Sequence, residues 1–356
     1  MFDSIRINNF RLFSDFQIDD LARVNLFVGL NNSGKSSLLE AIYLLANQGN
    51  PSAIFDLLGQ RGEVTLPSRD DIRLPNLRSY QISHLFADHQ LSYKERIDIR
   101  GYNQRTLSVR LYLAEAAQQL ELLRQAEDAP IVDRLVIEFG DNHQFEFPVN
   151  EQGTINEKLS RSWRPKDSSA SPVLSVTTAY LTYEQIASLW DQITLTDKED
   201  KVVSALQILD PDVQRISFTS QRTSNSGILV KLADQATPVP LGSLGDGMRR
   251  ILAIIASLVN AEKGVLLIDE IDTGLHHTVL NDVWRTIFET AQRLDCQVFA
   301  STHSWDCVSS FGLTLQDQPD GTGVLFRLER FPKSMKVIPY TPEELSIAVQ
   351  RWIEVR

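Results

Sequence analysis

The residues best suited to chemistry form a glycine-rich stretch near the start of the chain, GLNNSGKSS, Gly29 to Ser37. It matches G-x-x-x-x-G-K-[ST], and it lies between the strand-like run VNLFV and the helix-like run SLLEAIYLL, the context that this pattern requires. Backbone N–H groups of such a loop bind phosphates, Lys35 would reach the β- and γ-phosphates, and Ser36 could bind Mg²⁺. The sequence therefore predicts a P-loop (Walker A motif) for ATP and Mg²⁺. The loop residues predicted to bind ATP are Gly29, Asn31, Asn32, Ser33, Gly34, Lys35, Ser36 and Ser37.

A second candidate is the acidic end of an apolar run, GVLLIDEID, Gly264 to Asp272. Continuous apolar runs are typical of buried parallel strands, and α/β sheets place ligands at the carboxyl ends of such strands. Asp269 would hold Mg²⁺, directly or through water, and Glu270 would orient or deprotonate the attacking water. An acidic pair at a strand end is often only a helix cap, but beside a P-loop it indicates a hydrolytic site (Walker B motif).

A histidine ends the next apolar run, QVFASTHSW, Gln297 to Trp305. One helix-like segment separates this run from the acidic one, so the two strands are expected to be parallel neighbours. That arrangement would place His303 beside Glu270 and facing a γ-phosphate. A lone histidine at a strand end is more often structural, but this neighbour favours a catalytic role, together with Lys35 and Glu270.

Another glycine-rich stretch, VPLGSLGDGMRRIL, covers residues 239 to 252 and leads into a helix-like run. Glycines permit a close backbone approach, and a helix N-terminus presents free N–H groups to an anion. The P-loop of this chain lies elsewhere, so a second phosphate-binding segment needs a separate explanation. The candidate ligand residues in this segment are Ser243, Gly245, Asp246 and Gly247.

Apolar patterns along the chain indicate the elements that would position these motifs. From Leu244 onward the order is helix, apolar strand, helix, apolar strand, which is typical of an α/β fold. Helices are also expected in SSLLEAIYLLANQ, AEAAQQLELLRQAEDA, TYEQIASLWDQI and KEDKVVSALQIL, and strands in SIRINNFRLF, VNLFV, ERIDIRG, LSVRLYL, DRLVIEF, HQFEFPV, VQRISFTS and GILVKLA. No heptad pattern is sustained, so no long coiled coil is expected.

These patterns divide the chain into two predicted regions. Residues 1–50 and 236–356 would form the ATPase core, a mixed β-sheet with flanking helices. Residues 51–235 would form a mixed α+β insertion between the Walker A motif and the second glycine-rich stretch, with a lid and a helical subdomain. Within it, residues 51–78 and 151–172 are rich in Pro, Arg, Asp or Ser and are predicted to be loops.

Composition limits the function classes. The chain has 356 residues, 42% of them apolar, which is enough for a substantial core. Two cysteines, Cys296 and Cys307, are too few for a disulfide framework and have no metal-ligand spacing. The N-terminal residues lack the pattern of a signal peptide, and no apolar run approaches the roughly 18 residues of a membrane span. We therefore expect a cytoplasmic protein with no membrane partner.

The formal net charge of −11 argues against an extended nucleic-acid surface, so any such site must be a local basic patch. One candidate is KLSRSWRPK, in which Lys158, Arg161, Arg164 and Lys166 surround Trp163. Basic charge around an aromatic ring can contact nucleic acid, but a solvated loop explains the segment more simply. Nucleic-acid binding is therefore open but not evident from the sequence.

Taken together, the P-loop, glycine-rich signature, acidic strand and switch histidine resemble, in this order, the ATP-binding cassette (ABC) class of P-loop ATPases. Within the class, the chain resembles the ATPase domain of OLD (overcoming lysogenization defect) nucleases and the related RecF/SMC-like ATPases. The strong match covers roughly residues 1–48 and 240–356, through the segments INNFRLFSDF, GLNNSGKSSLLEAI, LGDGMRRIL, LIDEIDTGLHH and ASTHSWDC. The resemblance implies an ABC-type core in which the signature of one subunit closes on the nucleotide held by another.

Several further roles follow from the resemblance alone. Arg11, in the segment before the P-loop, would lie near the nucleotide. The segment Thr273 to His276 would be the loop that faces the dimer partner. The Q-loop glutamine of the class has two candidates, Gln81 and Gln90, and the sequence does not choose between them.

The resemblance also implies partners. OLD nucleases continue into a Toprim nuclease domain, but only about fifty residues follow His303 here. We therefore expect a stand-alone ATPase that forms a homodimer around ATP, or a higher oligomer, and acts with a separately encoded effector such as a Toprim-type nuclease in bacterial anti-phage defence. The alternatives are a RecF-like DNA-repair ATPase, a non-hydrolysing scaffold that restrains a toxic nuclease and, with least support, a transporter motor.

Overall fold

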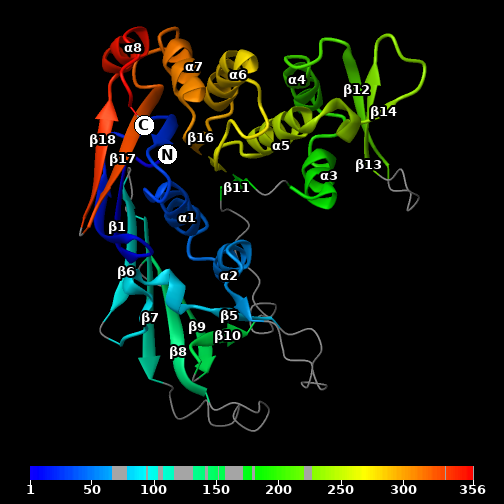
Figure 1. Cartoon of the computed structure of the whole chain (residues 1–356). Coiled ribbons are helices and arrows are strands. Elements are labelled where there is room, and N and C mark those ends of the chain that lie inside the picture. Colours follow the sequence, from blue (N-terminus) through cyan, green and yellow to red (C-terminus); the bar gives the residue numbers. More distant parts are fainter. Residues whose placement is uncertain are drawn as a thin grey trace.

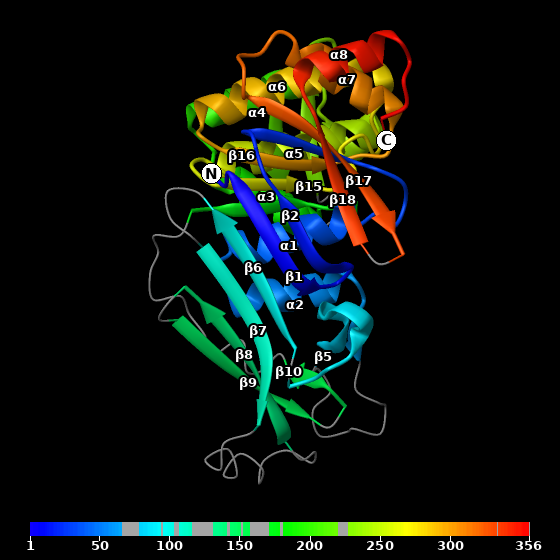
Figure 2. The same cartoon turned by 90° about the vertical axis from the view of Figure 1, so that its left-hand side faces the viewer.

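The computed structural model describes residues 1–65, 78–93, 95–102, 107–115, 131–140, 143–150, 152–156, 171–178, 181–219, 227–332 and 334–355. Two six-stranded sheets organise these residues, one in the upper part of Figure 1 and the other extending below it. Figure 2 shows the lower sheet face on, with the helices of the upper part behind and above it.

The core sheet has the strand order β11-β15-β16-β3-β17-β18. Its first five strands are parallel, and β18 closes one edge in the antiparallel direction. The central runs VNLFV and QVFAS are buried at every position, as expected for strands covered on both faces. The strands are β11 (Val173–Val176), β15 (Val265–Ile268), β16 (Gln297–Ser301), β3 (Val24–Val28), β17 (Gly323–Phe331) and β18 (Ser334–Tyr340).

The core sheet separates two hydrophobic cores, because successive side chains of a strand point to opposite faces. Leu26 of β3 packs in one core, and the neighbouring Phe27 packs in the other. The helices over the Leu26 face are α5 (Asp246–Asn260), α6 (Leu280–Arg293), α7 (Trp305–Leu315) and α8 (Pro342–Gln350). On the Phe27 face lies α1 (Lys35–Ala46), between the core sheet and the second sheet.

The second sheet is antiparallel throughout, with the order β2-β1-β6-β7-β8-β9. Alternation sets its two faces: Ile5 and Ile7 are buried in the core around α1, whereas Arg6 lies on the outer face. The N-terminal strands thus share a sheet with strands of the predicted insertion. The strands are β1 (Ser4–Phe10), β2 (Phe13–Ile18), β6 (Arg96–Tyr102), β7 (Leu107–Glu115), β8 (Ile131–Phe139) and β9 (His143–Asn150).

The remaining elements flank these sheets. Two helices and a small sheet gather around α5, on the right of Figure 1: α3 (Tyr183–Asp191), α4 (Asp197–Leu206), β12 (Val213–Thr219), β13 (Gly227–Leu232) and β14 (Val239–Pro240). Beside the second sheet lie α2 (Pro51–Gln60), β4 (Val64–Thr65), β5 (Ser79–Gln81) and β10 (Thr154–Asn156). Short 3₁₀ turns are η1 (Ser83–Leu85), η2 (Ala87–His89), η5 (Leu241–Leu244) and η6 (His277–Val279).

The structure confirms the α/β order after Leu244 and the predicted strands and amphipathic helices of the insertion that fall on described residues. It corrects the prediction of a loop at residues 51–78, because residues 51–60 form α2. Asn50 caps that helix by accepting a hydrogen bond from the Ser52 N–H, and Pro51 occupies its first turn, where proline is tolerated. Of the helix predicted at residues 114–129, Ala114 and Glu115 instead end strand β7, and the rest lies outside the described residues, as does the basic patch at residues 158–166.

A second correction concerns the domain division. Residues 173–176, predicted to belong to the insertion, form β11 and pair in parallel with β15 of the core sheet. This four-residue strand is too short to show a pattern of its own, and only its neighbour defines it. Among the described residues, the longest helix is α5, with 15 residues, so none forms a long coiled coil. Within the same ranges no helix has the length and apolarity needed to cross a membrane.

Candidate nucleotide-binding site

The P-loop connects β3 to α1, as the motif predicts. Gly29 and Gly34 both have positive φ, 147° and 93°, which favours glycine. At Gly29 a side chain is also excluded, because a Cβ would lie 2.5 Å from the Leu328 carbonyl oxygen of β17. The two glycines therefore form the tight turn and allow the neighbouring strand to approach the loop.

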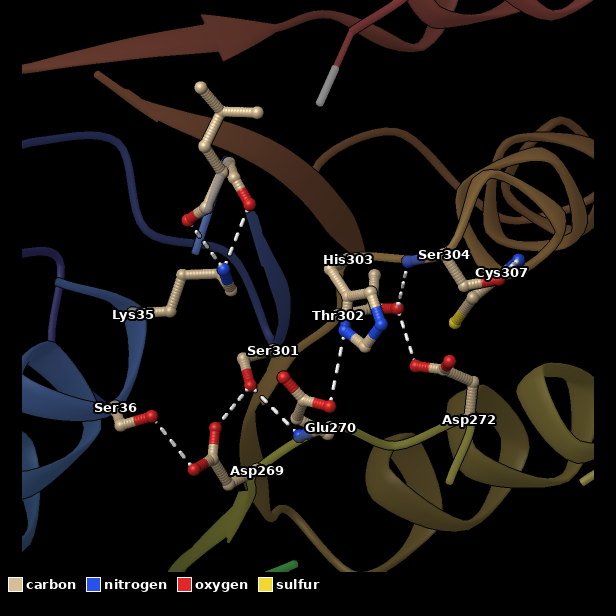
Figure 3. Close-up of polar contacts among 12 residues, drawn as sticks. Lys35, Ser36, Asp269, Glu270, Asp272, Ser301, Thr302, His303, Ser304 and Cys307 are labelled. Atoms are coloured by element: carbon tan, nitrogen blue, oxygen red, sulfur yellow. Dashed lines mark hydrogen bonds and ion pairs between the residues drawn. The ribbon is translucent and has the colours of Figure 1, made fainter. Parts of the chain in front are cut away.

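Lys35 lies within this loop and is 6% exposed. Its Nζ donates hydrogen bonds to the carbonyl oxygens of Gly29, at 2.8 Å, and Leu30, at 3.0 Å (Figure 3). Burial lowers the pKa of the ammonium group, and the charges of Glu270 and Asp269 partly offset that effect. The lysine is thus a buried cation that faces two carboxylates at the position where the motif predicts phosphates.

Asp269 is held from both sides. Ser36 Oγ donates to Asp269 Oδ2 at 2.8 Å, and Ser301 Oγ, at the end of β16, donates to Asp269 Oδ1 (Figure 3). A hydroxyl and a carboxylate oxygen are donors that Mg²⁺ prefers, and Mg²⁺ usually binds one or two carboxylates together with water and substrate phosphates. The donors at Ser36 and Asp269 therefore fit Mg²⁺.

Glu270 and His303 lie side by side, as predicted from the order of the strands. Strands β15 and β16 pair in parallel, with Ile268 opposite Ala300. His303 Nδ1 lies 3.1 Å from Glu270 Oε2 (Figure 3). The His303 side chain is 51% exposed and the Glu270 side chain 27%, so both reach solvent at the carboxyl edge of the sheet. A carboxylate and an imidazole in this position can accept a proton from a bound water.

Residues that the sequence analysis missed support this pair. The Glu270 N–H donates to Ser301 Oγ at 2.9 Å, and Thr302 Oγ1 donates to Asp272 Oδ1. The loop after the acidic strand is thereby tied to the strand that carries the histidine. The only signal in the sequence was the pair of hydroxyl residues directly before His303, and it does not reveal their partners.

The glycine-rich signature begins α5. Gly245 is its N-cap with φ 93°, and no side chain caps the helix. Gly247 is required for a different reason, because a Cβ there would lie 2.9 Å from the Gly274 carbonyl oxygen of the loop after the acidic strand. Ser243 and Asp246 are exposed. The first N–H groups of α5 are therefore accessible to an anion.

Among the described residues, the signature lines neither of two cavities that border the P-loop. The first, of about 520 Å³, lies between the loop residues 29–33 and the β17 residues 327–331. The second, of about 310 Å³, includes Ser36 and Asp269. The fold thus brings together the P-loop, the acidic pair and the histidine, and it leaves the signature beside the loop at Gly274.

Arg11 and the two glutamine candidates line neither cavity, although Glu40, a partner of Arg11, lines the second. The Arg11 guanidinium is buried and pairs with Glu40, at 3.0 Å, and Glu63, at 2.5 Å. Gln81 Nε2 donates to Ser83 Oγ and to the Gln152 carbonyl oxygen, and Gln90 is exposed.

A different glutamine lines the cavity beside Ser36 and Asp269. It is Gln60, the last residue of α2. Sequence reasoning missed it because residues 51–78 were predicted to be a loop.

Fold, motif order and site geometry together define an ABC-class P-loop ATPase. A family model described as "AAA ATPase domain" matches residues 1–196, more than half of the chain. A second, described as "AAA domain, putative AbiEii toxin, Type IV TA system", matches residues 189–306. The chain belongs to the AAA ATPase domain family.

Comparisons with individual proteins agree with this assignment. The chain is 24% identical over 347 residues to a Helicobacter pylori protein named ATP/GTP phosphatase, covering 89% of each chain. It is 42% identical to the DNA replication and repair protein RecF of Lactobacillus acidophilus over 65 residues, 18% of this chain and 17% of that protein. These matches support nucleotide binding and hydrolysis by an ATPase of this class.

Solved structures show the same fold. An Smc head bound to the C-winged helix domain of ScpA aligns with a TM-score of 0.50 at 13% identity, covering 97% of this chain and 99% of the other. An Smc head with an extended coiled coil, bound to the C-terminal domain of ScpA and derived from Pyrococcus furiosus, aligns with a TM-score of 0.50 at 12% identity, covering 99% of both chains.

Proposed function

We propose that this protein hydrolyses ATP to ADP and phosphate at the P-loop, with Glu270 as the general base. The carrying observation is the contact between Glu270 and His303, 3.1 Å apart, at the edge of the sheet that also holds Lys35 and the Ser36–Asp269 pair. Water attacks the γ-phosphorus, its proton passes to Glu270, and the bond to the ADP oxygen breaks. Mg²⁺, bound by Ser36 and Asp269, would neutralise charge on the phosphates when present.

Each of the remaining residues at the site has a separate role in this proposal. Lys35 balances the charge of the β- and γ-phosphates, and His303 donates a hydrogen bond to the γ-phosphate while it contacts Glu270. The loop residues predicted from the motif bind the phosphates through their N–H groups. Arg11 would act indirectly, because its partner Glu40 lies on α1, four residues after Ser36.

We further propose that two copies form a homodimer around two ATP molecules. The N-terminus of α5 is uncapped and lines neither cavity beside the P-loop of its own chain. A two-fold dimer would bring each signature, through Ser243, Gly245, Asp246 and Gly247, to the nucleotide of the partner. Assembly beyond this dimer is compatible with the proposal but is not required by it.

In this proposal, ATP binding and hydrolysis by the dimer pass a signal to a partner effector. The family description that mentions a putative toxin of a toxin–antitoxin system matches residues 189–306, which include the signature and the acidic strand. This match supports a role of the ATPase in bacterial defence in the cytoplasm, where it would signal to a separately encoded effector such as a Toprim-type nuclease.

A second candidate function is DNA repair of the RecF type, favoured by the match to RecF over 65 residues. The outer face of the second sheet does carry arginines, but acids lie beside them: Arg6 pairs with Asp15, Arg110 with Glu138, and Arg134 with Glu146. This mixed charge gives phosphates little attraction, so the signalling ATPase is preferred.

Turnover of the Glu270→Gln variant tests the proposal. We expect kcat to fall by about 100-fold or more, the size of effect that general bases provide, while ATP binding persists. The same variant should accumulate as an ATP-dependent dimer by light scattering. Glu262→Gln, at a surface acid paired with Lys198, is the matched control and should hydrolyse ATP at the wild-type rate. Equal turnover of Glu270→Gln and wild type would contradict the assigned role of Glu270, whereas a wild type that binds ATP without turnover would favour a non-hydrolysing scaffold.

A further inference from the structure

Arg250 is a buried cation in the third position after Gly247 on the signature helix α5. It is 1% exposed. Its Nη1 donates to the carbonyl oxygen of Thr177 at 2.6 Å, and its Nη2 donates to those of Asp269, at 2.7 Å, and Glu270, at 2.9 Å. The guanidinium thus binds the backbone at the carboxyl ends of two adjacent parallel strands, β11 and β15.

This position is costly for a charged side chain. A guanidinium removed from water is tolerated only when its N–H groups are hydrogen-bonded, and an apolar side chain would suit the surrounding core better. The carbonyl oxygens that Arg250 binds belong to the two acidic residues of the proposed site, Asp269 and Glu270. The charge is therefore placed where it fixes the backbone that carries those acids.

Glu270 needs such support. Its φ is +49°, a left-handed conformation that is uncommon for residues other than glycine and persists only when the surroundings hold it. Arg250 binds its carbonyl oxygen, and Ser301 Oγ accepts a hydrogen bond from its N–H. These contacts, on opposite sides of the residue, set the direction in which the Glu270 carboxylate leaves the backbone.

The same helix also contacts the loop after the acidic strand. Gly247 lies so close to the Gly274 carbonyl oxygen that a Cβ would come within 2.9 Å of it. The N-terminal turn of α5 therefore contacts this loop through Gly247 and the acidic strand through Arg250. A displacement of that turn changes the position of both.

We propose that Arg250 is a positioning residue that couples the signature end of α5 to the Glu270 of the same subunit. A phosphate bound at the N-terminus of α5 holds the first turn, and Arg250 passes that constraint to the Glu270 backbone. The nucleotide held by one subunit thereby promotes hydrolysis in the other. This inference rests on the proposed function, because the phosphate at the signature comes from the dimer partner.

Steady-state kinetics of Arg250→Gln and Arg250→Lys test the positioning role. We expect kcat to fall about 10- to 100-fold in Arg250→Gln, since small misplacements of catalytic groups have effects of this size, while KM and ATP binding change less than about threefold. Arg250→Lys keeps the charge and should recover part of the loss. Asn260→Ala is the control, because Asn260, on the same helix, donates to the Leu189 carbonyl oxygen away from the site and should leave kcat unchanged.

A double-mutant cycle with Gly247→Ala tests the coupling. If both residues act through one connection, the fall in kcat of the double variant is at least about threefold smaller than the product of the single effects. If the fall in kcat of the double variant equals the product of the two single effects, the coupling is refuted. If Arg250→Gln folds and keeps the wild-type kcat, the positioning role is refuted. If Arg250→Gln does not fold, as judged by thermal melting, Arg250→Lys carries the same cycle. If the wild type is active, Glu270→Gln is inactive and the Arg250 variants keep the wild-type kcat, this inference is refuted and the proposed function stands. If the wild type does not hydrolyse ATP, the proposed function itself is refuted.

Discussion

The P-loop and the signature end of α5 are both glycine-rich starts of helices, but the fold surrounds them differently. At the P-loop, Lys35 is 6% exposed and Ser36 is hydrogen-bonded to Asp269, which directly follows β15 and lies more than two hundred residues later. At the signature, a Cβ on Gly245 would meet nothing within 4 Å, and Asp246 is exposed. One site is assembled within the chain, and the other presents N–H groups to a ligand that the chain itself does not position.

A shared local motif therefore does not determine a shared role. A helix N-terminus attracts an anion wherever it occurs, but only contacts from other strands convert it into a catalytic site. Variants at the two sites should therefore fail in different ways.

Lys35→Ala should give the largest effect, on the site assembled within the chain. Removal of the buried cation that we propose contacts the phosphates is expected to weaken ATP binding about 100-fold. Isothermal titration measures the affinity, and Lys198→Ala, at a surface ion pair, is the control. If Lys35→Ala binds ATP with the wild-type affinity, the proposed difference between the P-loop and the signature end of α5 is contradicted.

Gly247→Arg should separate binding from assembly. The new side chain collides with the Gly274 carbonyl oxygen, so we expect the ATP-dependent dimer to weaken at least about tenfold, while ATP binding to the monomer changes less than about threefold. Light scattering with and without ATP measures the dimer. Gly227→Arg is the control, because a Cβ there meets no atom within 4 Å. A dimer that survives Gly247→Arg would contradict the half-site interpretation.

Ser301→Ala tests how far the assembled site depends on its supporting hydrogen bonds. The substitution removes one hydrogen bond to Asp269 and one from the Glu270 N–H, and supporting groups of this kind typically contribute about tenfold. We expect kcat to fall about tenfold in steady-state assays, with dimerisation retained. Ser310→Ala, at a buried serine of α7, should keep the wild-type kcat. A wild-type kcat in Ser301→Ala would show that Asp269 needs no second contact.

Asp246→Asn should give the smallest effect, at the open site. An acid in the first turn stabilises α5 but repels a bound phosphate, and charges at helix ends contribute about 0.3–1 kcal/mol. That energy corresponds to an ATP-dependent dimer that is about two- to fivefold tighter in Asp246→Asn. Loss of the favourable charge should also lower the melting temperature slightly. Sedimentation at several ATP concentrations measures the dimer, and a weaker dimer would show that Asp246 contacts the partner favourably.

Residues that act through a contiguous motif could be predicted from the sequence. The P-loop needs one strand, one loop and one helix in order, so GLNNSGKSS was sufficient to predict its position. The pairing of Glu270 with His303 was also predictable, because one helix between two apolar runs indicates parallel neighbours. In each case the deciding information lay within a few tens of residues.

Contacts between distant segments could not be predicted in this way. The residues around Arg11 do not indicate its partners, and only the tertiary structure shows it paired with Glu40 and Glu63. Gln60 was overlooked for the same reason, since its place in the cavity depends on how α2 packs.

The sequence was sufficient to predict the groups that we propose carry the chemistry: the P-loop with Lys35 and Ser36, the acids Asp269 and Glu270, and His303. This was possible because few functions other than phosphate binding and hydrolysis call for a glycine-rich loop with a lysine, followed later in the chain by an apolar strand that ends in acids. Only the folded chain shows that β11 joins the core sheet, that Ser301 donates a hydrogen bond to Asp269, and that Arg250 binds the backbone of Glu270. Those contacts join segments that lie far apart in the sequence, such as the β11–β15 partners Val173 and Val265, which are 92 residues apart. Fold topology sets such contacts, and local sequence pattern does not.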